Sequence, residues 1–229
     1  MQRARRATTV SQPGDLMAIY YDETILNLKP PHADCIHDER RYSIWFKPAG
    51  LMTQGSRFGD HCALTRLAEK HFTPSRPIFP VHRIDRETSG LVLVAHDRSA
   101  AALLSELFQK RRVEKHYRAL AVGKPATDNL PHLIDLALDG RPAQTRFSLL
   151  RHDAAANQSL LEIQTLTGRR HQIRRHFDLI GHPIVGDPKY GRKNKNQQGL
   201  QLVAYRLRFQ CPLNHVPMDF EIDPDRALS

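Results

Sequence analysis

Residues 82–95 read HRIDRETSGLVLVA, a charged segment that runs directly into an apolar one. The apolar half, Leu91 to Ala95, is short and rich in Leu and Val, so it predicts a buried strand. The charged half predicts a loop held in place by that strand, which is a rigid position for reactive side chains. Asp85 lies in this loop between Arg83 and Arg86. Taken alone, such a carboxylate is more often part of a surface salt bridge than of a reactive site.

The composition is that of a basic globular protein. The chain has 229 residues, of which 40% are hydrophobic and 25% charged, which suits one domain with a real core. Lys and Arg number 34 against 24 Asp and Glu, and the formal net charge is +10. A folded domain this basic most often binds a polyanion, and nucleic acid is the leading candidate.

The cysteines and the hydropathy pattern indicate where the protein works. Cys35, Cys62 and Cys211 are far apart and show no C-x-x-C spacing. This argues against a zinc ribbon and against a disulfide framework, and it is typical of reduced thiols. No apolar run approaches the length needed to span a membrane. We therefore expect a cytoplasmic protein without membrane association.

Helical periodicity predicts two main helices. Asp97 is expected to cap the first, whose apolar stripe comprises Ala100, Leu103, Leu104, Leu107 and Phe108. The second is predicted over residues 169–180, with Ile173, Phe177 and Ile180 facing the core and Gly181 as a left-handed C-cap. Asp60 is expected to cap a shorter helix that carries Leu64, Leu67 and His71 on one face.

The remaining periodic segments predict strands. They cover residues 42–46, 116–122, 144–150, 160–166, 200–209 and 217–222. Strands that mostly follow one another, with helices between some of them, indicate a largely antiparallel α+β domain. We assign this domain to residues 42–229. Residues 1–41 are expected to be a basic N-terminal arm and a short hairpin-like extension, with an apolar stretch at Leu16 to Tyr21.

Three basic clusters indicate contact with nucleic acid. They span Lys110 to Arg118, Arg169 to His176, and Lys189 to Lys195. Each alone is typical of a solvated face, but together they can neutralise several phosphates. Tyr117 and Tyr190 lie within them and can stack on bases. The composition does not distinguish RNA from DNA.

Five motifs, in this order, make the assignment specific. They are KPAG at 47–50, HRIDRETSGL at 82–91, KHYRA at 115–119, TGRRHQIR at 167–174 and GHPIVGDPKYG at 181–191. In this order and at these distances they resemble the RluA-type RNA pseudouridine synthases. The resemblance spans roughly residues 42–222. It implies a pseudouridine synthase fold with a central mixed, mostly antiparallel sheet, flanking helices and a basic cleft. It also implies isomerisation of uridine to pseudouridine in ribosomal or transfer RNA, without a cofactor or a metal.

The resemblance also implies roles for individual residues. Asp85 would be the catalytic aspartate, Tyr117 would stack on the target base and could assist proton removal, and Arg174 would pair with Asp85. Ile173 would form an apolar wall of the uridine pocket. Arg83 would enter the RNA in place of the flipped nucleotide. Lys47 would be mainly structural. The other RNA contacts expected are Arg86, Arg169, His171, Lys189 and Tyr190.

Other features and readings bear on the RNA target and on the chemistry. Members of this family often carry an N-terminal S4-like module, but residues 1–41 are too short and lack its pattern. The catalytic domain and its N-terminal arm are therefore expected to select the RNA, and we expect the protein to be a monomer. One alternative is a non-catalytic RNA-binding protein that retains the fold. Another is a metal-dependent hydrolase that uses His82, Asp85, His171 and His176. The spacing of five between the last two histidines does not place both on one helical face.

Overall fold

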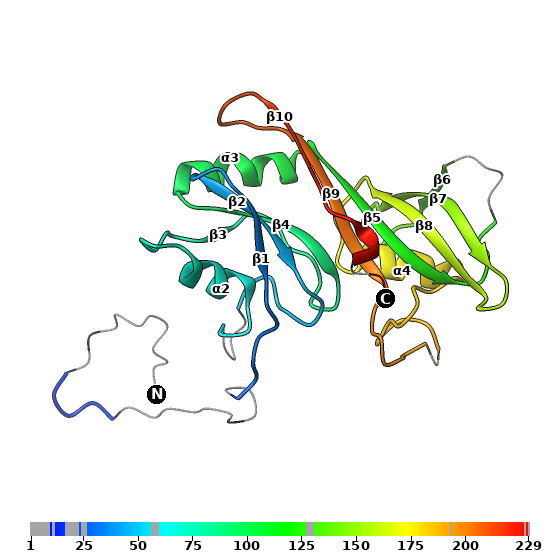
Figure 1. Ribbon diagram of the computed structural model, residues 1–229, viewed down its shortest axis with the longest axis horizontal. Coiled ribbons are helices and arrows are strands. Elements are labelled where there is room, and N and C mark those ends of the chain that lie inside the picture. The colour runs from blue at the N-terminus through cyan, green and yellow to red at the C-terminus, as the bar shows by residue number, and fades with distance from the viewer. Residues whose placement is uncertain are drawn as a thin grey trace.

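The computed structural model describes residues 27–55, 60–126, 131–192 and 194–226, with positions 10, 12–16, 23 and 228 near the ends. Within these ranges ten strands form one sheet, in the order β1-β2-β4-β9-β5-β8-β7-β6, with β3 beside β4 and β10 beside β9 (Figure 1). The strands are β1 (Asp34–Asp38), β2 (Tyr42–Lys47), β3 (Phe79–Pro80), β4 (Ser89–Ala95), β5 (Val113–Val122), β6 (His132–Asp135), β7 (Gln144–Asp153), β8 (Gln158–Thr165), β9 (Leu202–Gln210) and β10 (Pro217–Glu221). The helices are α2 (Leu64–His71), α3 (Arg98–Gln109), α4 (Gln172–Leu179) and the 3₁₀ helix η1 (Pro224–Arg226).

The sheet has a narrow joint between β4 and β9. These two strands are parallel and pair only at Ser89 with Val203 and at Gly90 with Ala204, whereas the other pairs are antiparallel. Gly90 has φ +123, and a Cβ there would overlap the backbone of Ala204, so only glycine fits. The predicted α+β fold with a mixed, mostly antiparallel sheet is confirmed.

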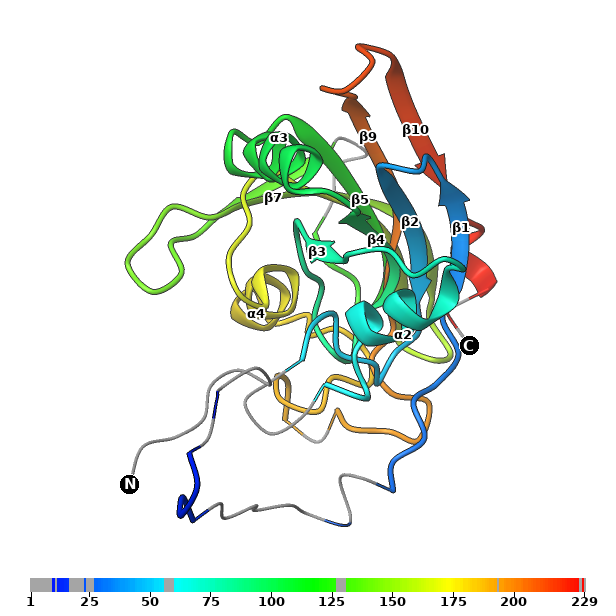
Figure 2. The ribbon, with the colours of Figure 1, turned by 90° about the vertical axis from the view of Figure 1, so that its left-hand side faces the viewer.

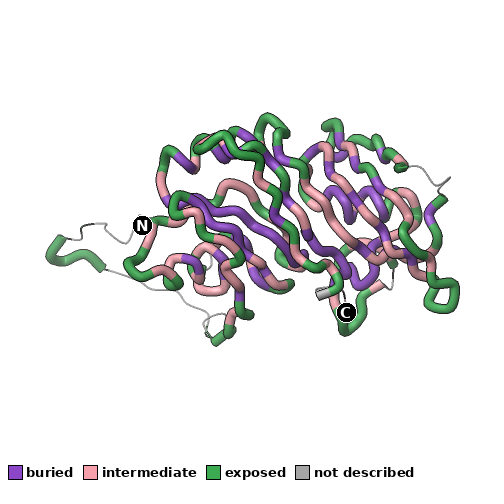
Figure 3. Tube along the Cα trace, turned by 45° about the horizontal axis from the view of Figure 1, so that its top comes forward, coloured by how far each residue is buried: buried purple, intermediate pink, exposed green. Residues whose placement is uncertain are grey.

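On one side of the joint, α2 and α3 enclose β2 and β4. Alternate residues of β4 point to opposite faces, as a pleated strand requires. Leu91 and Leu93 pack with Leu104 of α3, and Val92 packs with Leu64 of α2. All seven residues of β4 are therefore buried, and the buried trace continues along the central strands (Figure 3). The strand after the charged loop is the core strand that its sequence predicts.

On the other side, α4 covers β5, β8 and β7. Ile173 and Phe177 pack against Ala119, Leu161 and Phe147, as their spacing predicts. The chain leaves α4 through Gly181 at φ +82, the left-handed residue expected there. Figure 2 shows α3 and α4 on the same side of the sheet.

Some local predictions are corrected by the structure. Asp97 caps α3 by accepting from the Ala100 amide, as predicted, but Asp60 does not cap α2, which begins at Leu64 after Ala63 and has no side-chain cap. Leu103 of the predicted apolar stripe is 37% exposed. Strands β3 and β6 have no counterpart among the predicted elements, and β1 lies in the extension predicted before residue 42.

Residues 17–22 of the predicted extension lie outside the described ranges. Within those ranges β1 forms an antiparallel hairpin with β2 and adds an edge strand to the sheet. No described helix has both the length and the apolar character needed to cross a membrane.

Candidate active site

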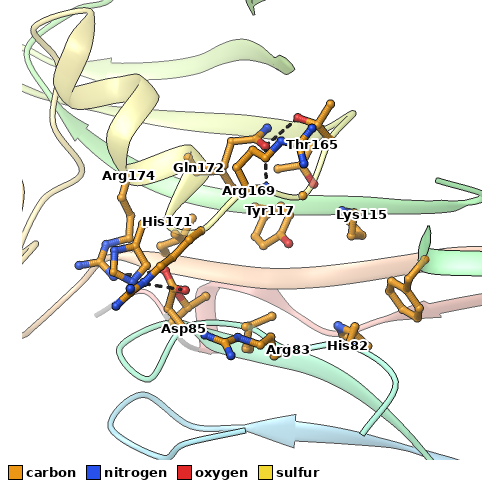
Figure 4. A pocket seen from close by; sticks show the side chains of 18 of the residues that line it. His82, Arg83, Asp85, Lys115, Tyr117, Thr165, Arg169, His171, Gln172 and Arg174 are labelled. Carbon is orange, nitrogen blue, oxygen red and sulfur yellow. Dashed lines mark hydrogen bonds and ion pairs between the residues drawn. The ribbon is translucent and has the colours of Figure 1, made fainter. Parts of the chain in front are cut away.

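A cavity of about 570 Å³ opens at the joint between the two halves of the sheet. The loop before β4 lines one wall, and β5 with the segment that leads into α4 lines the other (Figure 4). A second cavity of about 500 Å³ adjoins it. The residues common to both linings are Arg83, Ile84, Asp85, Arg170, His171 and Arg174. Asp85 is thus accessible from both cavities.

The structure brings Asp85 and Arg174 together, as the motifs predict. The Arg174 Nη1 donates to Asp85 Oδ2 at 3.2 Å. The side chain of Arg174 is only 2% exposed, whereas that of Asp85 remains 23% exposed. A buried guanidinium therefore fixes a carboxylate that a ligand in the cavity can still reach.

Arg174 is itself anchored by Asp187, a residue that the sequence did not single out. Its Nε and Nη2 donate to the two oxygens of Asp187 at 2.7 and 2.8 Å. Asp187 also accepts from the backbone amides of Lys189 and Tyr190. Burial alone would raise the pKa of Asp187, but Arg174 and the two amides outweigh it and lower this pKa. The only sequence signal for Asp187 was its position within the last motif.

Tyr117 faces the cavity from β5. Its ring lies between Asp85 and Lys115 along the cavity (Figure 4). Burial raises the pKa of the Tyr117 hydroxyl to about 12, and the Asp85 charge acts in the same direction, so the phenol is neutral at pH 7. Ile173, 5% exposed, lines the same cavity. A flat ring and an apolar side chain thus face the space beside the carboxylate.

His171 and Tyr190 support the charged end of the site. His171 stands before α4 at φ +52, and its Nε2 lies 3.8 Å from Asp85 Oδ1. Its Nδ1 is hydrogen-bonded to the Tyr190 hydroxyl at 3.0 Å, and the Tyr190 ring lies 5.3 Å from Arg174 Cζ. Burial lowers the pKa of His171, although the Asp85 charge opposes this. Tyr190 lines neither cavity, so it supports the site only through its contacts with His171 and Arg174.

The remaining predicted RNA contacts are spread over the two cavities. Arg83 is exposed and lines both, and Arg169 lines the first and donates from Nε to the Pro142 carbonyl at 3.0 Å. Arg86 and Lys189 line the second. Arg86 is paired with the neighbouring Glu87 at 2.9 Å.

Lys47 stabilises the loop that carries Asp85 through hydrogen bonds to backbone carbonyls. Its side chain is fully buried, and its Nζ donates to the carbonyls of Leu51 at 2.8 Å, Pro48 at 2.9 Å and Arg86 at 3.1 Å. The Gly50 amide donates to the same Arg86 carbonyl at 2.8 Å. Burial lowers the pKa of Lys47 to about 7. These contacts agree with the structural role expected for Lys47.

The geometry does not favour the metal-dependent alternative. His176 is buried, and its two ring nitrogens are hydrogen-bonded to Thr145 Oγ1 and to the Leu136 carbonyl. His82 Nε2 accepts from the Leu93 amide at 2.9 Å. Nitrogens used in this way are not available as ligands. Across the described ranges, no three His, Cys, Asp or Glu side chains are grouped so that they could hold a metal ion.

Comparison with known proteins identifies the family. The family model described as RNA pseudouridylate synthase matches residues 41–179. The dual-specificity RNA pseudouridine synthase RluA of Vibrio vulnificus is 31% identical over 226 residues, which cover 86% of this chain and 88% of that protein. The ribosomal large subunit pseudouridine synthase C of Haemophilus influenzae is 33% identical, over 80% of this chain and 62% of its own.

A solved structure gives the same result for the fold. Human RNA pseudouridylate synthase domain containing 1 superposes with a TM-score of 0.70 at 24% identity, over 86% of this chain and 87% of that one. The family match, which covers more than half of the chain, defines the class of protein as RNA-modifying. The chain belongs to the RNA pseudouridylate synthase family, and the resemblance to its RluA-type members is confirmed.

Proposed function

We propose that this protein isomerises specific uridines to pseudouridine in structured RNA, with Asp85 as the catalytic residue. The observation that carries this proposal is the chain of contacts from Asp187 through Arg174 to Asp85. It leaves one carboxylate accessible, in a fixed position, beside the ring of Tyr117 in the same cavity. The reaction requires no cofactor.

The reaction needs a nucleotide outside its helix. A base within a duplex cannot be turned, so the target uridine must be extruded, which costs roughly a few kcal/mol. Arg83 is exposed, lines both cavities and is the residue proposed to fill the vacancy in the RNA. The surrounding arginines compensate for the remaining cost by binding phosphates.

The extruded uridine would lie between Tyr117 and Ile173, with Asp85 at its sugar. The bond between N1 and C1′ breaks, uracil turns, and C5 bonds to C1′. The C5 hydrogen leaves as a proton and N1 takes up a proton, so the product is an isomer of the substrate. The Asp85 carboxylate can attack C1′, attack the base or remove a sugar proton, and each route needs it beside the uridine. The neutral Tyr117 supplies a stacking face and a hydroxyl for proton transfer.

The proposed substrates are ribosomal or transfer RNA in the cytoplasm. The name of the Haemophilus relative refers to the ribosomal large subunit, and that of the Vibrio relative to dual specificity. Profiling of pseudouridine in RNA from a deletion strain would identify the uridine that is lost.

The test of catalysis is tritium release from transcripts that carry 5-tritiated uridine. The wild type should release tritium, and a folded Asp85→Asn variant should release it about 10²–10⁴-fold more slowly. The alternative, a non-catalytic RNA-binding protein, predicts RNA binding without release by the wild type. Turnover retained by Asp85→Asn would remove Asp85 from the mechanism.

A further inference from the structure

At the end of the first cavity farthest from Asp85 lie cations that form no ion pair with any carboxylate of the described residues. Lys115 and Arg111 line it, and Figure 4 shows Lys115 and His82 opposite the group of Asp85, His171 and Arg174. A Cβ on Gly168 would lie 3.8 Å from Lys115 Nζ, which places the ammonium against the second wall. In the described part of the chain no carboxylate pairs with Lys115. Burial, together with the charge of the neighbouring Arg111, lowers the pKa of Lys115 to about 8.

Arg111 occupies a position where glycine is preferred. It follows α3 with φ +56, and its amide donates to the Phe108 carbonyl while the next amide, of Arg112, donates to that of Leu107. This is the left-handed residue of a helix C-terminal cap, where a Cβ costs free energy. Here that residue carries a guanidinium that lines the cavity. Strain of this kind is commonly retained for function.

His82 adds a fixed neutral donor to the same end. Its Nε2 accepts a hydrogen bond from the Leu93 amide at 2.9 Å, so in the neutral ring the proton lies on Nδ1. Burial lowers the pKa of His82 to about 3, which keeps the ring neutral at pH 7. The ring stacks on Phe108 at a centroid distance of 4.3 Å and an angle of 16°. Its orientation is therefore set before any ligand binds.

We propose that Lys115, Arg111 and His82 bind a phosphate of the RNA backbone adjacent to the target uridine. Two unmatched cations and one neutral donor suit an anionic oxygen cluster, whereas a uracil carbonyl would leave the charges uncompensated. The subsite shares its cavity with Asp85, so a phosphate bound there fixes the uridine relative to the carboxylate. This inference rests on the proposed function and adds a residue-level contact for its substrate.

Salt dependence of RNA binding tests the phosphate contact. The probe is a fluorescein-labelled oligouridine of about a dozen nucleotides, titrated between about 50 and 200 mM salt. Lys115→Gln should bind about 10-fold more weakly than the wild type at low salt, and the slope of log K against log salt should decrease in magnitude by about 1. Lys70→Gln is the matched control, because Lys70 is exposed on α2 and lines neither cavity. An unchanged slope for Lys115→Gln would overturn the proposal.

A glycine at position 111 separates a binding role from a structural one. Arg111→Gly removes both the strain and the guanidinium, so the melting temperature should rise by about 2 °C while RNA binding weakens. An arginine retained for stability would give the opposite result, a lower melting temperature with unchanged RNA binding. That outcome would remove Arg111 from the subsite.

A neutral linkage identifies which phosphate is bound. Oligonucleotides with a single uridine and one methylphosphonate, placed 5′ or 3′ of it, are compared on the wild type and Lys115→Gln. The linkage that weakens wild-type binding but not binding by Lys115→Gln is the one held. Equal losses in both proteins at both linkages contradict the subsite. Tritium release by the wild type is scored separately, so a failed subsite is distinguishable from a failed isomerase.

Discussion

The two ends of the cavity differ in whether their positive charges are paired with carboxylates. At one end Arg174 contacts two carboxylates, Asp187 and Asp85, and Glu87 lies 3.9 Å away. At the other end Lys115 and Arg111 line the cavity, and no carboxylate of the described ranges pairs with Lys115. In the free protein the cation at the first end already has its carboxylates, whereas the cations at the second end gain a counter-charge only when an anion enters. Asp85 is therefore a reactive group positioned by the protein itself, whereas Lys115 and Arg111 form a contact that the RNA completes.

The paired end should be sensitive to loss of either partner. A buried ion pair contributes little net stability, but removing one partner leaves an uncompensated charge. Asp187 is 1% exposed and Arg174 is 2% exposed, so water cannot replace Asp187 as the partner of the Arg174 charge. The unpaired end should respond mainly in binding, because its cations have no partner in the described part of the free protein to lose.

The largest effect is expected for Asp187→Asn. The variant should lose about 3–5 kcal/mol of unfolding free energy, because Arg174 is left partly unpaired, and its tritium release should fall with it. Denaturant unfolding at pH 7 measures the first quantity. Asp139→Asn is the control. Asp139 also pairs bidentately with an arginine of α4, Arg175, but its side chain is 73% exposed. That change should cost no more than about 1 kcal/mol. Equal losses in the two variants would contradict the comparison.

Arg174→Lys should separate catalysis from binding. One ammonium cannot bond both oxygens of Asp187 and also Asp85, so Asp85 loses its fixed position. Tritium release should fall by about 10²-fold while the affinity for RNA stays near that of the wild type. Arg175→Lys serves as the control, because Arg175 lies next to Arg174 on α4 but lines neither cavity. A parallel loss of RNA affinity would indicate instead that Arg174 contacts a phosphate.

Lys47 provides an intermediate case, a buried cation bonded to carbonyls alone. Its pKa is lowered to about 7 in the folded protein, below that of a free lysine, so between these values the unfolded chain binds more protons. Unfolding free energy should therefore rise from pH 7 to pH 10, by at most about 1.4 kcal/mol per pH unit, relative to Lys47→Met. Taking the difference between the two proteins removes the contributions of other groups, Lys115 included. A pH-independent difference would contradict the assignment.

Arg83→Ala should have the smallest effect. The side chain is exposed, so stability should change by no more than about 0.5 kcal/mol. Modification of a structured RNA should slow, whereas binding of a single-stranded oligonucleotide should change little, because only a helix has a vacancy to fill. Modification of structured RNA at the wild-type rate would exclude the wedge role.

The sequence predicted the parts of the site that depend on motifs and local rules. The Asp85–Arg174 pair was expected from motif order, and the Asp97 cap from the residue that precedes an apolar stripe. The same capping rule failed at Asp60, because the chain turns for three more residues before α2 begins at Leu64. Capping depends on the helix boundary, which is set by packing as well as by the cap residue.

Other parts depended on contacts that periodicity does not contain. Asp187 meets Arg174 only because the chain after α4 folds back over the helix. Lys115 and Tyr117 are two positions apart in β5, so a common face was foreseeable. That Lys115 would lack a counter-charge was not, because this depends on side chains from α3, the Asp85 loop and the α4 segment together.

The most direct test compares the two ends in one experiment. Single-turnover tritium release is measured with enzyme in excess over RNA, together with the affinity for the same RNA, for Asp85→Asn and Lys115→Gln. We expect Asp85→Asn to bind RNA nearly as well as the wild type and to react about 10²–10⁴-fold more slowly, and Lys115→Gln to lose more in affinity than in rate. A folded Asp85→Asn variant that reacts at the wild-type rate would contradict the central claim that the fixed carboxylate is the catalytic group.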